Sequence, residues 1–241
     1  MNARARIGLL GGTLDPVHVG HVETALAARR ALNLDRVDVL PSHAPPHRAQ
    51  QPVASGYHRF AMTALAVNGI DGLAASDVEL RAPGPSYTAD TLVRFRETSG
   101  LGAAQIFFIT GADAFAEIAT WHRYPEVLEL AHFVVVSRPG FPVEDLPGRL
   151  PDLASRMTGV QPDPAHQAPA FNRVARASSP SIFLVNAPTP DVSSSEIRRR
   201  LASREPLADL VPDGVSRHIA QHGLYTESVG SLAADHLHGE H

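Results

Sequence analysis

Two histidines, His18 and His21, stand three residues apart shortly after a pair of glycines, Gly11 and Gly12. Residues three apart share one face of a helix, so both imidazoles can meet one ligand, and Gly20 between them leaves access open. Glycines let the backbone approach a ligand closely, and a helix start offers free N–H groups and a positive dipole end. The pattern predicts a phosphate cradle in which histidines donate hydrogen bonds and stabilise charge during phosphoryl-group chemistry.

The basic residues narrow this chemistry, because all 21 of them are arginine and the chain has no cysteine. A P-loop lysine, a Schiff-base lysine, thiolate metal sites and thiol nucleophiles are therefore excluded. A codon bias explains the missing lysine, but the constraint holds either way. Phosphate must be bound by arginine, histidine and backbone N–H groups.

Two later segments carry groups suited to a second, anionic ligand. His47 and Arg48 follow an expected strand behind two prolines, and their charge suits a mononucleotide phosphate, with an ordinary surface loop as the alternative. The segment 86–92 opens an expected helix after a Pro-Gly-Pro turn, so N–H groups around Thr88 can hold a small carboxylate. A capping role for Ser86 or Thr88 is compatible with that, because capping uses other N–H groups.

Trp121 is the only tryptophan, and Asp113 precedes it on the same segment. A lone tryptophan is most often a core residue, but its flat face can also stack on a pyridine ring. Asp113 is either the N-cap of the following helix or a ligand contact.

A serine-rich segment near the C-terminus, 192–198, carries a capping-box pattern made by Ser193 and Glu196. The helix start that it predicts offers N–H groups and hydroxyls to phosphates, and Arg198 adds charge one turn later. The neighbouring Arg199 and Arg200 are expected on the solvated face of this helix.

These segments, in this order, resemble a known family. The string from Gly11 to His21 is similar to the (H/T)xGH signature of nucleotidylyltransferases, and its extended form resembles bacterial nicotinate-nucleotide adenylyltransferases, with Leu14 where that family usually has Phe. The segments 45–48, 86–92 and 192–198 resemble that family's Pro-Pro-His-Lys, Ser-Tyr-Thr-x-Asp-Thr-Leu and Ile-Ser-Ser-Thr-x-Ile-Arg motifs. The resemblance covers residues 6–138 and 181–225. No G-x-G-x-x-G fingerprint follows the first expected strand, which argues against a dehydrogenase.

The resemblance implies transfer of AMP from ATP to nicotinate mononucleotide, giving deamido-NAD and pyrophosphate, with Mg²⁺ on the triphosphate and no dedicated protein metal site. It implies catalytic roles for His18, His21 and Arg198. The residues it implies for ATP binding are Gly11, Gly12, Thr13, Leu14, His18, His21, Gly111, Asp113, Arg138, Ser194, Ser195 and Arg198. Those it implies for nicotinate mononucleotide are His47, Arg48, Tyr87, Thr88 and Trp121.

Two other functions stay open. One is a nucleotidylyltransferase of the same superfamily whose acceptor is nicotinamide mononucleotide or phosphopantetheine. The other is a non-catalytic nucleotide-binding regulator.

Along the chain, short β-rich apolar runs alternate with amphipathic helical stretches, and this pattern indicates βαβ units. The expected fold is an α/β, Rossmann-like doubly wound parallel sheet with a small C-terminal helical extension, in one domain over 1–225. Strands are expected at 7–10, 37–40, 74–78, 105–110, 133–137 and 182–185. Helices are expected at 18–32, 57–67, 88–98, 113–119, 125–130, 194–203 and 212–222.

Two stretches have compositions typical of flexible chain. They are the Pro/Ala-rich insertion 139–180 and the tail 226–241, whose histidines His236, His238 and His241 are expected to be solvated rather than metal-bound.

The charge balance limits the partners, because 21 basic and 25 acidic residues give a net charge of −4. No basic stripe suggests polymeric nucleic acid. The apolar run at 7–10 is too short for a signal peptide core or a membrane span, so no membrane partner and a cytoplasmic location are expected. A homo-oligomer stays open.

Overall fold

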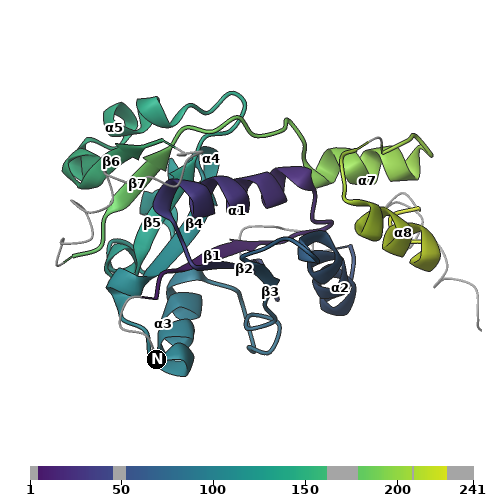
Figure 1. The fold of residues 1–241 in the computed structure, drawn as a ribbon, viewed down its shortest axis with the longest axis horizontal. Helices are drawn as coiled ribbons and strands as arrows, with labels where there is room; N and C mark the ends of the chain where they lie inside the picture. Colours follow the sequence, from purple (N-terminus) through teal and green to yellow (C-terminus); the bar gives the residue numbers. More distant parts are fainter. Residues whose placement is uncertain (1–4, 46–52, 162–178, 208, 227–241) are drawn as a thin grey trace, which may run out of the picture.

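Apolar runs in the chain form a central sheet of parallel strands (Figure 1). The computed structural model describes residues 5–45, 53–161, 179–207 and 209–226. Within them, the strands are β1 (Ile7–Gly12), β2 (Arg36–Pro41), β3 (Leu73–Ala75), β4 (Ile106–Gly111), β5 (His132–Val136), β6 (Met157–Val160) and β7 (Ile182–Val185). Their order is β3-β2-β1-β4-β5-β7-β6. The chain moves outward from β1 to β3 and then crosses back to β4, so the topological switch point, where such sheets bind ligands, lies between β1 and β4.

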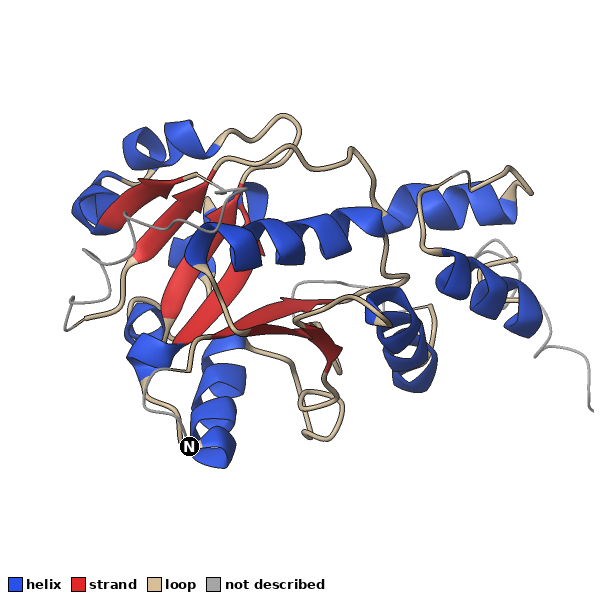
Figure 2. Ribbon diagram, in the orientation of Figure 1, coloured by secondary structure: helices blue, strands red, loops and turns tan. Residues whose placement is uncertain are grey.

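Helices cover both faces of this sheet (Figure 2). They are α1 (Val19–Leu32), α2 (Gly56–Val67), α3 (Thr88–Ser99), α4 (Ala112–Phe115), α5 (Leu146–Arg149), α7 (Ser194–Ala202) and α8 (Asp213–His222). Short 3-10 turns lie at Ala103–Gln105, Ile118–Thr120, Glu126–Glu129, Val143–Asp145 and Pro151–Arg156. Helices α7 and α8 stand at the end of the molecule beyond α1, with α8 beside α2 (Figure 1).

Alternating strand residues fill two separate cores, one on each face of the sheet. Leu10 and Ile109 point into the cluster that α1, α2 and α8 complete. Leu9 and Phe108 point into the other cluster, with α3 and the 3-10 turns. This two-sided packing makes the strands buried on both faces, which is typical of parallel sheets. It confirms the predicted doubly wound α/β fold with a C-terminal helical extension.

Several predicted boundaries differ from the structure. The strand expected at 74–78 stops at Ala75. The helix expected at 113–119 is divided into α4 and a 3-10 turn, and the one expected at 125–130 is a 3-10 turn only. Both are short links into or out of buried strands, where i to i+3 bonds close a turn in fewer residues.

The insertion expected to be flexible is ordered in its first half. Residues 143–160 contain two 3-10 turns, α5 and β6, and β6 pairs in parallel with β7 at the edge of the sheet. The composition of this segment does not indicate a strand, because β6 is stabilised by pairing with a segment that is distant in sequence. Residues 162–178 and 227–241, including the tail histidines, lie outside the described residues.

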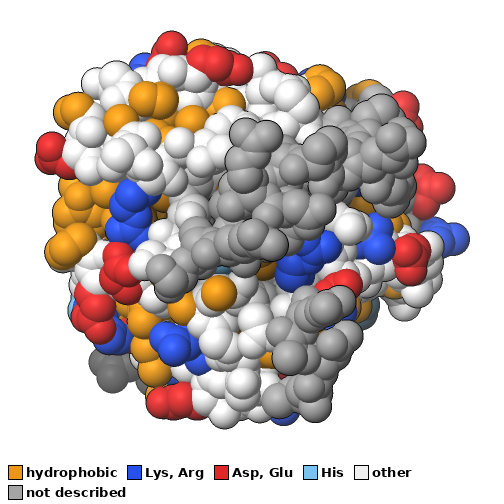
Figure 3. All heavy atoms as spheres, turned by 60° about the vertical axis from the view of Figure 1, so that its left-hand side comes forward, with side chains coloured by type: hydrophobic (Ala, Val, Ile, Leu, Met, Phe, Trp, Pro, Cys, Tyr) orange, Lys and Arg blue, Asp and Glu red, His pale blue; other side chains and the backbone are white. Residues whose placement is uncertain are grey.

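Charged side chains of both signs lie on the face of the molecule drawn in Figure 3. Arginine and acidic side chains lie interspersed there rather than gathered into one basic area (Figure 3). Within the described part of the chain, no helix is long and apolar enough to cross a membrane.

Candidate active site

A cavity of about 370 Å³ opens at the switch point, at the carboxyl ends of β1 and β4. Its wall combines the loop after β1, the start of α1, the start of α4 and the residues after β5. Predicted nucleotide-binding residues that line it are Gly11, Gly12, Thr13, His21, Gly111, Asp113 and Arg138. Segments about 100 residues apart in sequence therefore meet at one site.

His18 and His21 lie together at the start of α1. Their ring centroids are 3.7 Å apart, and the backbone N–H of His18 donates to Nδ1 of His21 at 3.2 Å. Because Nδ1 accepts, the proton of a neutral His21 is on Nε2, which is the donor that this side chain offers to a phosphate oxygen. His18 is the N-cap residue of the helix rather than its first member.

Burial sets the charge state of His18. Its side chain is only 2% exposed, and its Nδ1 atom has no hydrogen-bond partner among the described residues. Burial, and then the nearby charge of Arg138, lower the pKa of His18 to about 3. A neutral imidazole therefore lies under His21 at neutral pH. Gly20 permits this packing, because a Cβ there would lie 3.1 Å from the His18 ring and 3.0 Å from Val192.

The predicted supply of free N–H groups at the start of α1 is smaller than expected. The N–H of Val19 donates to the carbonyl of Leu210 at 3.1 Å, and that of His21 donates to the carbonyl of His18 at 3.0 Å. The side chain of His21 and the loop before the helix are therefore the main features that this segment presents to the cavity.

Gly111 brings an acidic and a basic side chain close to the end of β4. A Cβ at this position would lie 2.4 Å from Oδ1 of Asp113 and 3.1 Å from Cδ of Arg138, so a larger residue would displace these two side chains. Asp113 and Arg138 form an ion pair at 3.8 Å. Asp113 lies inside the first turn of α4, whose N-cap is Gly111, so the capping alternative for Asp113 is wrong.

Arg59 on α2 holds the loop after β1, and the sequence analysis missed it. The guanidinium is buried and donates to the carbonyl oxygens of Thr13 at 2.8 Å, Ser42 at 2.6 Å and Ala54 at 3.2 Å. These acceptors belong to loops far apart in sequence, so no local pattern could reveal the role of Arg59. It positions the loop rather than lining the cavity.

Asp15, inside the glycine-rich string, is a second residue whose role comes from distant partners. Its carboxylate accepts hydrogen bonds from the N–H groups of Val53 and Ala54 and from the hydroxyl of Tyr225 at 2.7 Å. Asp15 therefore ties the C-terminal end of the described chain to the loop after β1.

A buried carboxylate, Glu79, also lines the cavity and was not predicted. Its Oε1 accepts from the hydroxyl of Thr91 at 2.9 Å, and its Oε2 has no hydrogen-bond partner within the described residues. Burial raises the pKa of Glu79, while the hydroxyls of Ser86 and Thr91 oppose that shift. The site thus contains an acid close to the predicted phosphate cradle.

The serine-rich segment reaches the same loop from α7. Ser194 donates to the carbonyl of Pro16 at 2.9 Å, and Arg198 donates to the carbonyl of Asp15 at 2.6 Å and to Ser195 at 3.3 Å. Ser193 caps the helix as predicted, by accepting from the N–H of Glu196.

The other half of the predicted capping box is missing. The carboxylate of Glu196 pairs instead with Arg199 and Arg200, at 2.9 and 2.7 Å. All three side chains lie on the solvated face, as predicted for the two arginines.

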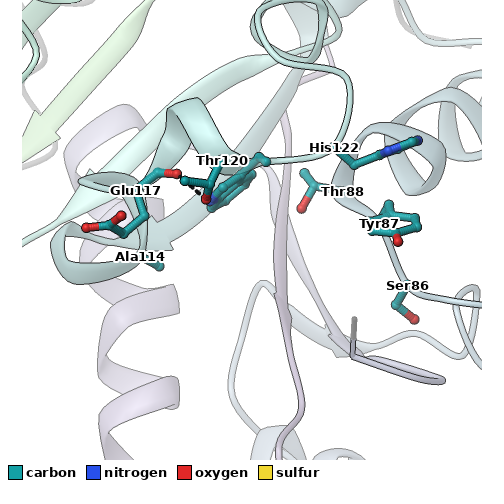
Figure 4. Close-up of a pocket in the computed structure, with 8 residues that line it drawn as sticks. Ser86, Tyr87, Thr88, Ala114, Glu117, Thr120 and His122 are labelled. Carbon is teal, nitrogen blue, oxygen red and sulfur yellow. Dashed lines mark hydrogen bonds between the residues drawn. The ribbon is translucent and has the colours of Figure 1, made fainter. Parts of the chain in front are cut away.

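A second cavity, of about 410 Å³, adjoins the first. Figure 4 shows Ser86, Tyr87 and Thr88 on one side of it and Ala114, Glu117 and Thr120 on the other. Tyr87 stacks on His122, with ring centroids 4.2 Å apart. Four residues line both cavities: Ser86, Thr88, Ala114 and Trp121. The two cavities therefore form one continuous cleft.

Trp121 has one side in the core and one in the cleft. It meets Phe108 and Phe133 edge-on, with centroids 6.1 and 6.2 Å apart. It also lines both cavities, so its packing in the core leaves one side available in the cleft, and its stacking on a ligand stays a prediction.

The start of α3 carries no side-chain cap. Tyr87 is its N-cap residue and makes no side-chain cap hydrogen bond, while the hydroxyl of Ser86 accepts from the N–H of His43 at 2.8 Å. Ser86 therefore joins α3 to the loop after β2, and the capping alternative for Ser86 and Thr88 is wrong.

One predicted ATP-binding residue has its side chain outside the cleft. The side chain of Leu14 is 1% exposed and packs in the core on the α1 side of the sheet, so only its backbone is available to a ligand. His47 and Arg48 lie outside the described residues.

The sequence of this chain is similar to those of known proteins. A model of the cytidylyltransferase-like family matches residues 9–200. A curated relative from Chromohalobacter salexigens, named "Probable nicotinate-nucleotide adenylyltransferase", is 38% identical over 222 residues, which cover 92% of this chain and 96% of the relative. One of the same name from Pseudomonas fluorescens is 40% identical over 223 residues, covering 91% and 97%.

A solved structure shares the fold. The Plasmodium falciparum nicotinic acid mononucleotide adenylyltransferase complexed with NaAD matches with a TM-score of 0.67 at 18% identity, covering 93% of this chain and 98% of that one.

Proposed function

The chain belongs to the nicotinate-nucleotide adenylyltransferases, and we propose that its cleft transfers AMP from ATP to nicotinate mononucleotide, releasing pyrophosphate and deamido-NAD. A phosphate oxygen of the mononucleotide attacks the α-phosphorus of ATP. The bond from the α-phosphorus to the bridging oxygen of the β-phosphate breaks, and pyrophosphate leaves. No covalent enzyme intermediate is needed, because the acceptor phosphate is already an anionic nucleophile.

One observation carries the proposal: the two cavities are continuous and differ in character. The cavity between β1 and β4 presents His21, backbone groups and Arg138, which suit a triphosphate. The adjoining one presents Trp121, Tyr87 and the uncapped start of α3, which suit a flat ring that carries a carboxylate. A mononucleotide in the second cavity would direct its phosphate toward the first.

In this proposal the histidines act on the phosphates. Nε2–H of His21 donates to a triphosphate oxygen, while neutral His18 supports the His21 ring from below. Donors already held in place stabilise the charge that shifts onto the leaving pyrophosphate without reorganising. Ser194 and Arg198 reach the loop after β1 from α7, and we propose that they and Ser195 bind the β- and γ-phosphates.

A divalent ion accompanies the triphosphate, and we propose Mg²⁺. This ion keeps waters and substrate oxygens as ligands and needs few protein groups. The carboxylates at the cavity, Glu79 and Asp113, fit that requirement, since they can hold waters of an ion carried by ATP. The proposed location of the reaction is the cytoplasm, where ATP is available.

Pyrophosphate release tests the substrate assignment. The enzyme is supplied with MgATP and equal concentrations of nicotinate or nicotinamide mononucleotide. We expect release that depends on the acceptor and is faster with the nicotinate form. Faster release with the amide would overturn the substrate, and no release with either would favour a non-catalytic regulator.

A further inference from the structure

Three histidines gather on the side of the molecule that carries α2 and α8, outside the cleft. His58 comes from α2, and His218 and His222 come from α8. One ring nitrogen of each lies within 4.8 Å of the other two. Nδ1 of His58 and Nε2 of His218 are 3.1 Å apart. The catalytic proposal uses none of these side chains.

The spacing is close to that of a transition-metal site. Zinc binds imidazole nitrogen at about 2.0–2.1 Å, so two nitrogens on a tetrahedral ion stand about 3.4 Å apart. The pair His58 and His218 is already near this distance. His222 is exposed and one helical turn from His218, so a rotamer change can bring its nitrogen in without moving the backbone.

The two helices hold these ligands on a rigid frame. His58 near the start of α2 meets the second half of α8, while a Cβ on Gly214, at the start of α8, would lie 3.3 Å from Cβ of Leu65, near the end of α2. The helices are therefore antiparallel and closely packed at both ends. Sites built on helices hold ligand geometry better than sites on loops.

We propose that His58, His218 and His222 form a zinc site with three protein ligands, which clips α8 onto α2. The fourth position is open to water. The donor set is all imidazole, which suits Zn²⁺ and disfavours Mg²⁺ or Ca²⁺, whose preferred ligands are oxygen. This ion would be distinct from the Mg²⁺ that accompanies ATP.

The clip joins two parts that support the cleft. Helix α2 carries Arg59, which holds the loop after β1, and the chain just after α8 carries Tyr225, which donates to Asp15 in that loop. An ion that binds only the folded arrangement stabilises it by mass action. The expected role is therefore structural, and the ion takes no part in the transfer reaction.

Cobalt is the probe that reads geometry as well as binding. The full chain, freed of metal with a chelator, is titrated with Co²⁺ and then with Zn²⁺. We expect one equivalent of Co²⁺ to give the intense visible absorption of a tetrahedral site, and Zn²⁺ to displace it. We also expect Zn²⁺ to raise the midpoint of thermal unfolding.

Two variants locate the site. His222→Ala changes an exposed position, so the variant should fold. It should weaken metal affinity at least about 10-fold, because losing even a residue that only hydrogen-bonds to a metal ligand costs that much. A variant with His236, His238 and His241 all changed to Ala should bind as the wild type does. The proposal would be overturned if His222→Ala bound metal as the wild type does, if only the tail variant lost binding, or if no saturable binding occurred. In the last case the three rings would be a hydrogen-bonded group alone.

Discussion

At the scale of residues, the cleft combines a donor and a support. His21 lines the cavity and its Nδ1 accepts a hydrogen bond, while His18 lies beneath it, buried and neutral. The backbone N–H of His18 fixes the ring of His21, so the two residues act as a unit.

The packing under His21 can be tested at Gly20. Gly20→Ala adds a methyl group 3.1 Å from the ring of His18 and 3.0 Å from Val192. Overpacking of this kind costs about 1–3 kcal/mol, and here it would displace His18 and with it His21. We expect kcat to fall about 10-fold or more in a protein that stays folded. Gly148→Ala, which meets nothing within 4 Å, is the matched control, and equal kcat values in both variants would exclude this role.

Trp121 can be tested as a stacking surface for the acceptor. Trp121→Ala should raise KM for nicotinate mononucleotide about 3- to 10-fold, the equivalent of one aromatic pair, and affect KM for ATP less. Trp121→Phe should keep part of the effect because it keeps a ring. Steady-state kinetics with each substrate varied in turn measures both constants. A rise confined to KM for ATP would contradict the assignment.

At the scale of elements, the loop after β1 is held from three sides. Arg59 of α2 binds its carbonyl groups, α7 binds it through Ser194 and Arg198, and Tyr225 binds Asp15. The loop is thus positioned by elements that are far away in sequence. The shape of the loop, residues 13–18, therefore depends on the whole fold and not on its own sequence alone.

Removing the guanidinium of Arg59 tests this dependence. Arg59→Met keeps the apolar stem but leaves the carbonyls of Thr13, Ser42 and Ala54 without their donor. Leaving buried acceptors unpaired costs about 1–3 kcal/mol each, so we expect a lower free energy of unfolding and a higher KM for ATP. Chemical denaturation and kinetics measure the two effects. Arg30→Met, at an exposed position on α1, should change neither, and an Arg59→Met enzyme with unchanged stability would contradict the assigned role.

Most of the helices and strands could be predicted from the sequence. Periodicity predicted six of the strands and the long helices to within a few residues, because those signals are local. The ordered motifs predicted several of the residues that line the cleft, among them His21, Gly111 and Arg138. Strand β6 was missed because its pairing with β7 crosses a long insertion.

The missed site residues have the same physical cause. Three of these residues act through partners that lie in other elements: Arg59, Glu79 and Asp15. The sequence around each of them does not indicate those partners. Leu14 lies inside the predicted binding motif, but its side chain packs in the core, so only its backbone is available to a ligand.

At the scale of the whole molecule, buried histidines couple stability to pH. His132 begins β5, far from the cleft, and its Nδ1 accepts from the N–H of Ser181 at 3.0 Å. Burial lowers the pKa of His132 to about 4, against a partly opposing effect of its backbone hydrogen bonds. His18 shifts in the same direction.

The sign of the pH effect follows from these pKa values. Below about pH 6.5, the unfolded chain protonates its histidines while the folded chain keeps His132 neutral down to about pH 4. The free energy of unfolding should therefore fall as pH falls through this window, by about 2 kcal/mol from this residue between pH 7 and about 4.5. Urea denaturation of the wild type and His132→Gln at both pH values checks it. The variant should lose less stability on acidification, and equal losses would contradict the prediction.

Adenylyl transfer to nicotinate mononucleotide in the cleft beside His21 is the proposed reaction. It is tested most directly by kcat for nicotinate-mononucleotide-dependent pyrophosphate release in His21→Ala, with His236→Ala in the tail as control. Removing one preorganised donor to developing charge costs about 100- to 1000-fold in kcat. We predict a loss of that size in a folded His21→Ala protein and none in the control. A folded His21→Ala enzyme with near-normal kcat would contradict the role assigned to His21 and its cleft.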